Sequence, residues 1–102
     1  MDVLKYPMLM LPATKNYLWG GERLRRRYGK APDGNGPLAE SWELSCHPDG
    51  PSVIGNGMFA GETLSAYIDL CPDSILGSRY AGTRELPILV KLIDAAEPLS
   101  IQ

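Results

Sequence analysis

The side chains best suited to chemistry gather near the end of the chain, in residues Pro87–Gln102. Lys91 carries an ammonium group inside an apolar run, and Ser100 and Gln102 supply a hydroxyl and a carboxamide two positions apart. On one sheet face, these three groups would line a polar cavity and could meet hydroxyl or phosphate oxygens of a ligand.

Two strands joined by a short loop would position these groups. Residues 88–93 form a compact run of β-branched and aliphatic side chains, residues 94–98 have turn chemistry, and residues 99–102 alternate apolar and polar. The period of two places Ser100 and Gln102 on one face of the last strand. We expect Lys91 to share that face, and the chain to end in mid-strand.

Lys91 has two interpretations that the local pattern does not separate. A lysine within an apolar strand can be a gatekeeper that prevents aggregation. Alternatively, its ammonium group faces a cavity, where it pairs with an anionic substrate or takes part in proton transfer.

A second strand is predicted from the alternation of Ser41–Ser45. The alternation places Trp42 and Leu44 on one side and three polar side chains, those of Ser41, Glu43 and Ser45, on the other. Glu40 and Glu43 are three residues apart, so on a strand they point to opposite faces and form no ready acid–base pair. His47 is the single histidine and cannot by itself supply a triad or a metal site.

A basic helix is predicted at Glu22–Tyr28, with Gly29 as its left-handed cap. It contains four arginines: Arg23, Arg25, Arg26 and Arg27. Such a cluster could hold a phosphate or nucleic acid, although a solvated helix face is its commoner use. The net charge of −2 argues against a nucleic-acid partner.

The other local signals predict short elements, in keeping with 11 glycines and 9 prolines in 102 residues. Thr63 has the chemistry of an N-cap, and apolar residues recur at helical spacing up to Pro72. Before Thr63, the Asn56-Gly57 pair is a hairpin signal. The remaining predictions are a strand at Met8–Leu11, a loop at Ala31–Pro37, a turn at Pro48–Pro51, a strand at Ser52–Ile54 and a helical turn at Ser74–Tyr80.

The composition predicts a cytoplasmic protein without a membrane partner. Cys46 and Cys71 lack the spacing of a zinc ribbon or a redox motif, and we expect both thiols to be reduced. No apolar run has membrane-spanning length, and prolines interrupt the apolar residues near the N-terminus, which argues against a signal peptide.

Four ordered blocks resemble the N-terminal segment of type I mannose-6-phosphate isomerases, the phosphomannose isomerases of the cupin superfamily. The resemblance covers nearly the whole chain. Its blocks are Leu18–Gly21, Ala39–Ser45 with His47-Pro48 and Gly50–Ser52, the Asn56-Gly57 turn, and Pro87–Asp94 with Leu99–Gln102.

The resemblance implies a mainly β protein with a few short helices, forming the N-terminal part of a cupin-type, jelly-roll β-barrel. Residues 1–102 would be a single partial domain of the catalytic unit. The implied activity is the interconversion of mannose 6-phosphate and fructose 6-phosphate through an enediol, with zinc polarising the substrate oxygens.

The resemblance also implies roles for individual residues. Gln102 matches a zinc ligand, and Lys91 matches a catalytic position in the substrate cavity. Ser100, Glu40 and Trp19 match positions that contact the phosphorylated hexose. The local sequence offers a simpler reading of Trp19, as an aromatic anchor at a turn.

The other zinc ligands of the family are missing from these 102 residues, so we expect the chain alone neither to hold catalytic zinc nor to isomerise sugar phosphates. We also expect the open strand edge beside Leu99–Gln102 to promote self-association. An alternative to the isomerase is a non-catalytic cupin-like protein with a sugar-binding or regulatory function. A third is a nucleic-acid binder that uses the basic helix.

Overall fold

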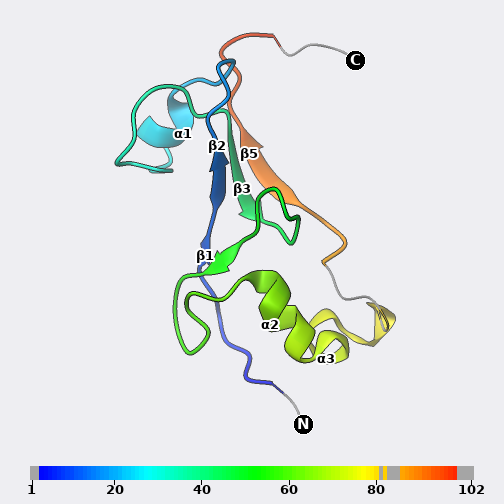
Figure 1. Ribbon diagram of the computed structural model, residues 1–102. Helices are drawn as coiled ribbons and strands as arrows, with labels where there is room; N and C mark the ends of the chain where they lie inside the picture. Colours follow the sequence, from blue (N-terminus) through cyan, green and yellow to red (C-terminus); the bar gives the residue numbers. More distant parts are fainter. Residues whose placement is uncertain (1–2, 81, 83–85, 99–102) are drawn as a thin grey trace.

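A computed structural model describes residues 3–80, 82 and 86–98, and shows an elongated chain built on two small antiparallel sheets (Figure 1). The strands β2, β3 and β5 form one sheet, and β1 pairs with β4 in the other. The helices α2 and α3 lie at one end of the molecule and α1 at the other. The described elements are β1 (Met10–Leu11), β2 (Ala13–Lys15), α1 (Arg23–Arg26), β3 (Glu40–Leu44), β4 (Val53–Ile54), α2 (Leu64–Leu70), α3 (Pro72–Leu76), the 3-10 turn η1 (Ser78–Tyr80) and β5 (Val90–Ile93).

The three-stranded sheet is antiparallel throughout, with β3 in the middle. Lys15 of β2 lies opposite Glu40 of β3, and Lys91 of β5 lies opposite Trp42 of β3. Residues directly opposite each other in an antiparallel pair project from the same face. Because Glu40 and Trp42 are two residues apart on β3, all four side chains share one face of the sheet.

The main hydrophobic core lies where the helices meet the two-stranded sheet. Its buried residues come from the end of β4, from α2 and from the segment after β3: Ile54, Leu64, Tyr67, Ile68 and Cys46. The half of the chain around α1 has a smaller buried set, in which Leu24, Leu38 and Ala39 are at most 3% exposed. The three-stranded sheet therefore joins two separately packed ends.

Several sequence predictions are confirmed at the level of local structure. The Thr63 side chain accepts a hydrogen bond from the Ala66 N–H and so caps α2. Pro72 follows α2 and also begins α3, where its missing N–H costs nothing. The basic helix is shorter than expected, with only four residues in α1, but Gly29 adopts the predicted left-handed conformation, with φ of +65°.

One prediction is confirmed in part and another is wrong in detail. Asn56-Gly57 lies in a turn between Val53 and Thr63, which form an antiparallel bridge, but the turn is longer than a two-residue hairpin. The Asn56 side chain accepts from the Leu9 N–H and donates to the Pro7 carbonyl, and β4 also pairs with the distant β1. The alternation along β3 fails, because the register shifts between Trp42 and Leu44. Leu44 packs against the main core, whereas Trp42 does not belong to that cluster.

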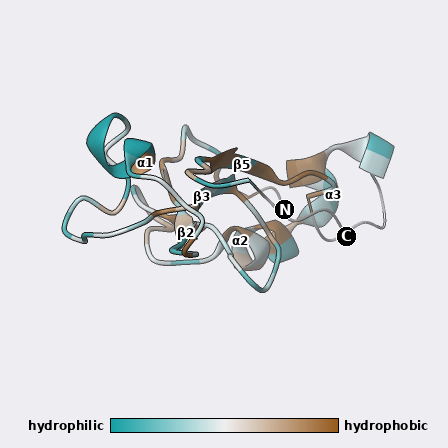
Figure 2. Cartoon of the chain, turned by 90° about the horizontal axis from the view of Figure 1, so that it is seen from above, coloured by the Kyte–Doolittle hydropathy of each residue, from teal (hydrophilic) through white to brown (hydrophobic). Residues whose placement is uncertain are grey.

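The predicted last strand, Leu99–Gln102, lies outside the described residues. Its expected partner is present as β5, which begins at Val90 rather than at Ile88. Figure 2 shows β5 as hydrophobic and α1 as hydrophilic. Within the described ranges, no helix is both long and apolar enough to cross a membrane.

Candidate functional site

The candidate site is the face of the three-stranded sheet that carries Lys15, Glu40, Trp42 and Lys91. Three different strands contribute these side chains, so their proximity depends on the tertiary structure. Glu40 and Lys91 are 51 residues apart in sequence, and their side chains meet with 3.4 Å between Nζ and Oε1. The predicted catalytic lysine therefore contacts a residue that was predicted to bind substrate.

Glu40 is a buried carboxylate, with only 8% of the residue exposed. Its Oε1 atom accepts two hydrogen bonds, one from the Trp42 indole N–H at 2.7 Å and one from the Lys91 ammonium group at 3.4 Å. A buried charge of this kind is stable only when it is paired and hydrogen-bonded, and both conditions are met here. Glu43 takes different partners, Ser41 and Lys30, which agrees with the prediction that the two glutamates do not work as a pair.

Trp42 lies at the centre of this face. The Lys15 and Lys91 ammonium groups lie 4.8 Å and 5.3 Å from the centroid of its ring, within the range of cation–π attraction. His47 contacts the same ring edge-on, with 5.7 Å between centroids. Lys15 also donates to the Asp49 carbonyl, which ties the turn after β3 to this side of the sheet.

Trp42 and Lys15 were not among the predicted site residues. The only signal for Lys15 is its strand pairing with Glu40, which one sequence cannot reveal. Trp42 was predicted to face the same side as Leu44, as an apolar residue would, but its indole N–H makes it a partner of the site carboxylate.

Trp19 lies on a loop that passes beside the strand carrying Glu40. Gly20 follows Trp19 directly, and a methyl group added to Gly20 would come within 2.5 Å of the Ala39 backbone nitrogen. The Trp19 carbonyl accepts from the Ala96 N–H, which holds the loop against the segment after β5. Its ring stacks on Tyr17 with 5.7 Å between centroids. Among the described residues, no contact of this ring with Glu40 or Lys91 is found.

Asp94 is a second buried carboxylate that the sequence pattern assigned to a turn. Its Oδ2 atom accepts from the Arg23 backbone N–H at 2.9 Å, and its main chain bonds to Gly21 and Ala39. The Arg23 side chain lies 3.9 Å from Oδ1. Asp94 therefore holds the first turn of α1 and the Trp19 loop against the end of β5, which is a structural role.

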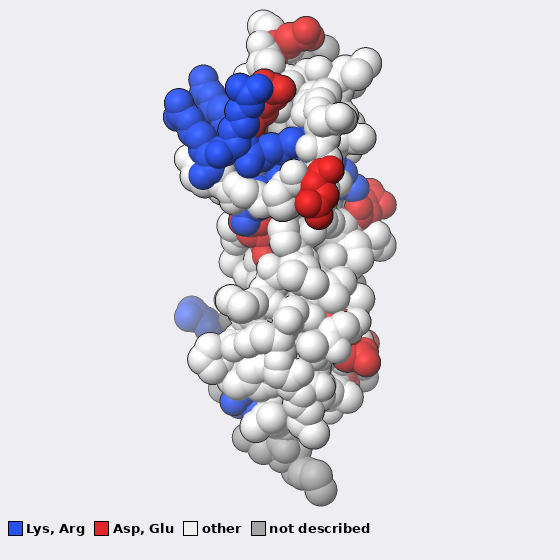
Figure 3. All heavy atoms as spheres, turned by 90° about the vertical axis from the view of Figure 1, so that its left-hand side faces the viewer, with Lys and Arg blue, Asp and Glu red and all other residues white. Residues whose placement is uncertain are grey.

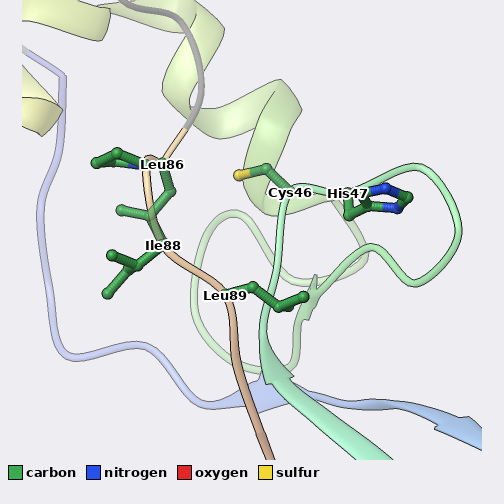
Figure 4. Close-up of a pocket in the computed structure, with 6 residues that line it drawn as sticks. Cys46, His47, Leu86, Ile88 and Leu89 are labelled. Carbon is green, nitrogen blue, oxygen red and sulfur yellow. The ribbon is translucent and has the colours of Figure 1, made fainter. Parts of the chain in front are cut away.

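A hollow of about 200 Å³ lies beside the end of β3 and is lined by Cys46, His47 and residues 86–89 (Figure 4). The Cys46 thiol points to the side of Leu86, and the His47 ring projects the opposite way. The two side chains therefore do not form a cysteine–histidine dyad. His47 instead accepts from the Asp49 N–H at 3.0 Å, as a loop histidine does.

The basic cluster forms one continuous patch on the surface around α1 (Figure 3). Most of its side chains have partners within the chain. Arg25 donates to the carbonyls of Ala31 and Gly36, and Arg26 pairs with Glu22 at 3.1 Å. The two Arg25 contacts hold the loop at residues 31–36 against α1, and the absence of a nucleic-acid partner stays a prediction.

The described residues do not by themselves provide a metal site. Within 3–80, 82 and 86–98, no three His, Cys, Asp or Glu side chains lie close enough together to hold an ion. Gln102, the predicted zinc ligand, and Ser100, the predicted substrate contact, lie outside the described residues, and so does their expected alignment with Lys91.

Comparison with known proteins decides the family. The sequence family described as "Phosphomannose isomerase type I, catalytic domain" matches residues 8–102. The chain belongs to this family.

Several relatives of this chain are named mannose-6-phosphate isomerases. "Probable mannose-6-phosphate isomerase GmuF" from Bacillus subtilis is 36% identical over 99 residues, which cover 97% of this chain and 30% of that protein. The mannose-6-phosphate isomerase of Escherichia coli is 34% identical over 95 residues, covering 91% of this chain and 24% of the relative. The chain thus spans less than a third of the length of these relatives.

Two solved structures share the fold of this chain. The mannose 6-phosphate isomerase of Bacillus subtilis superposes with a TM-score of 0.76 at 33% identity, covering 89% of this chain and 28% of that structure. An E134A mutant of phosphomannose isomerase from Salmonella typhimurium gives a TM-score of 0.72 at 30% identity, covering 91% of this chain and 24% of that structure. The predicted fold, mainly β with a few short helices and part of a cupin-type barrel, is confirmed.

Proposed function

We propose that this chain contributes the Glu40–Lys91 side of the active site in an enzyme that interconverts mannose 6-phosphate and fructose 6-phosphate. The observation that supports the proposal most directly is the contact between the Lys91 ammonium group and the buried Glu40 carboxylate, on a sheet face where Trp42 and Lys15 also lie. The family match and the names of the relatives supply the reaction.

The isomerisation moves a proton between C1 and C2 of the sugar and passes through an enediol. Negative charge develops on the carbonyl oxygen as the proton leaves the neighbouring carbon, and a fixed donor near that oxygen lowers the barrier. Lys91 supplies such a donor, since its ammonium group has three N–H bonds and Glu40 occupies one direction. Its side chain is 34% exposed, so a ligand on this face can reach it.

Glu40 has two roles in this proposal. Its carboxylate orients Lys91 toward the open side of the sheet, and its second oxygen can accept a hydrogen bond from a sugar hydroxyl. Ser100 and Trp19 are further substrate contacts in the proposal, on the strength of the resemblance.

The proposed enzyme would use zinc to polarise the substrate oxygens, and Gln102 would be the zinc ligand from this chain. Among the described residues no three His, Cys, Asp or Glu side chains gather, so a catalytic zinc would need protein ligands besides Gln102. A cytoplasmic location is also proposed, and both cysteines are free thiols, as that compartment favours.

A chimeric enzyme tests the proposal. Residues 8–102 replace the matching segment of the Bacillus subtilis mannose 6-phosphate isomerase, and the fructose 6-phosphate formed from mannose 6-phosphate is measured in a coupled assay. Turnover that disappears in the Lys91→Met chimera supports the proposal. A folded chimera that binds mannose 6-phosphate without turnover would contradict it and favour the non-catalytic sugar-binding alternative.

The isolated 102-residue chain provides the complementary measurement. We expect neither stoichiometric zinc uptake nor turnover, because a catalytic zinc site takes about three protein ligands. Turnover by the purified chain alone would show that the whole site lies within these residues.

A further inference from the structure

We propose that Trp42 is a positioning residue, which sets the place of the Glu40 carboxylate and through it the place of the Lys91 ammonium group. The inference rests on the proposed function, because it assigns a role within the same site. It begins from the Trp42 indole N–H, which donates to Glu40 Oε1 at 2.7 Å, the same oxygen that receives the longer bond from Lys91.

The lengths of the two bonds indicate which contact holds the carboxylate. The indole bond is 2.7 Å long and buried, with both residues at most 9% exposed. The Lys91 contact is 3.4 Å long, and the Lys91 side chain is 34% exposed. A short buried bond to a charged acceptor is stronger than a long one that water can screen. Trp42 therefore fixes Glu40, and Lys91 follows the carboxylate.

The Trp42 ring also acts on Lys91 directly. The Lys91 ammonium group lies 5.3 Å from the ring centroid, so the same side chain attracts it through the π-system while holding the carboxylate with which it pairs. Lys15 lies 4.8 Å from the same centroid. The indole is thus the common neighbour of both ammonium groups and the carboxylate on this face.

The Trp42 ring is itself fixed in place by its surroundings. A methyl group added to Gly50 would overlap the six-membered part of the indole, which shows how closely the turn after β3 packs on it. His47 packs edge-on against it from the same turn. A ring that is wedged in this way can position a carboxylate with little loss of side-chain entropy at the moment of binding.

Spectroscopy on the 102-residue chain tests the positioning without any enzyme activity. The chain has two tryptophans, Trp42 and Trp19, so its indole N–H region has two signals. We expect Glu40→Gln to move the Trp42 indole signal and to speed its exchange with solvent. Trp42→Phe keeps an aromatic ring but removes the donor, and we expect it to move the Glu40 side-chain carboxyl ¹³C signal.

Trp19→Phe is the matched control, because Trp19 stacks on Tyr17 and shows no contact with Glu40 in the described part of the chain. It should leave the Glu40 signal where it is. A Glu40 carboxyl signal that is the same in the wild-type and Trp42→Phe chains, with both folded by circular dichroism, would overturn the proposal.

Kinetics of the chimeric enzyme then test the consequence for the reaction. Trp42→Phe should lower kcat about 10-fold to 100-fold with a smaller change in KM, since misplaced catalytic groups affect the chemical step most. In the Glu40→Gln background the same substitution should have little further effect. Fully additive losses would show that Trp42 does not act through Glu40 and would overturn the proposal.

The two measurements separate this inference from the proposed function. If the chimera with unaltered residues lacks turnover while the Glu40 signal still responds to Trp42→Phe, the proposed function fails and the positioning of Glu40 by Trp42 stands. If the chimera turns over and the signal does not respond, the positioning role fails and the proposed function stands.

Discussion

The Lys91 ammonium group lies 3.4 Å from the Glu40 carboxylate, although 51 residues separate them and they belong to neighbouring strands of one sheet. The antiparallel register of β3 and β5 creates this contact, because it places Lys91 opposite Trp42 and next to Glu40 on the same face. A gatekeeper lysine needs only solvent around its ammonium group. The carboxylate partner and the aromatic ring near Lys91 favour the cavity interpretation.

Removal of either charge should abolish most of the isomerase activity of the chimeric enzyme. In the proposed site, Lys91→Met removes the donor to the developing oxyanion, and Glu40→Gln removes the charge that orients Lys91. We expect kcat/KM to fall about 100-fold or more in each case, the typical loss for such a group. Arg79→Met is the matched control, since Arg79 is an exposed cation in η1 and should change the rate by less than about twofold. Wild-type kinetics for the Lys91→Met variant would show that Lys91 is not part of the active site.

Asp94→Ala should destabilise the chain while leaving the Glu40–Lys91 contact intact. The substitution deprives the Arg23 N–H of its acceptor at the start of α1, and we expect a loss of about 1 to 2 kcal/mol in the free energy of unfolding. Urea denaturation followed by circular dichroism measures this loss. Asp33→Ala removes an exposed carboxylate from the loop before residue 34 and should cost about 0.5 kcal/mol or less. Equal midpoints for the two variants would rule out the capping role.

Gly20→Ala should disturb the loop that carries Trp19. The added methyl group would lie 2.5 Å from the Ala39 nitrogen and 2.6 Å from its Cα, and these backbone atoms cannot move aside without shifting the strand of Glu40. We expect a loss of about 1 to 3 kcal/mol in the free energy of unfolding, as for other overpacked sites. Gly34→Ala is the control, because its new methyl group would meet the Arg25 guanidinium, the far end of a flexible side chain. If Gly34→Ala lowers the free energy of unfolding more than Gly20→Ala does, the close packing of Gly20 on Ala39 is not the more important contact.

Local chemistry made the helices predictable. The Thr63 N-cap, the apolar spacing that follows it and the terminating Pro72 each act within a few residues, so one sequence contains the whole signal. The left-handed conformation of Gly29 is also a local signal, because it depends on the residue type at the end of the helix. The acceptor for the first turn of α1 was not predictable, because Asp94 lies 71 residues away from Arg23.

The sheet was predictable only as a set of strands. Of the five described strands, β2 (Ala13–Lys15) was not predicted, whereas the other four have a recognisable pattern. The pairing of β1 with β4 and the order β2-β3-β5 depend on contacts between distant residues. The register shift after Trp42 is the clearest case, because it moves Leu44 to the main core against the expected alternation. Lys91 was singled out by its place inside an apolar run and Glu40 by the family resemblance, whereas the places of Trp42 and Lys15 depend on strand pairing.

The exposed side of β5 should make the isolated chain self-associate. In the described sheet β5 has β3 as its one neighbour, and the apolar residues along it and before it are open to solvent: Ile88 is 59% exposed, Leu89 40%, Val90 44% and Ile93 51%. An unpaired apolar strand is a template for a second copy. We expect the mean sedimenting mass to rise between about 10 and 100 µM, a range in which such edges commonly associate.

Charges introduced on that edge test the surface itself. The double variant Ile88→Lys, Val90→Lys places two ammonium groups beside the open backbone, and repulsion between copies should keep the chain monomeric over the same concentrations. Met58→Lys is the matched control, because Met58 is 77% exposed but lies in the loop after β4, away from β5. If Met58→Lys suppresses association as strongly as the double variant, the copies meet through the other end of the molecule. A chain that sediments as a monomer at every concentration would show that the open edge of β5 is already protected.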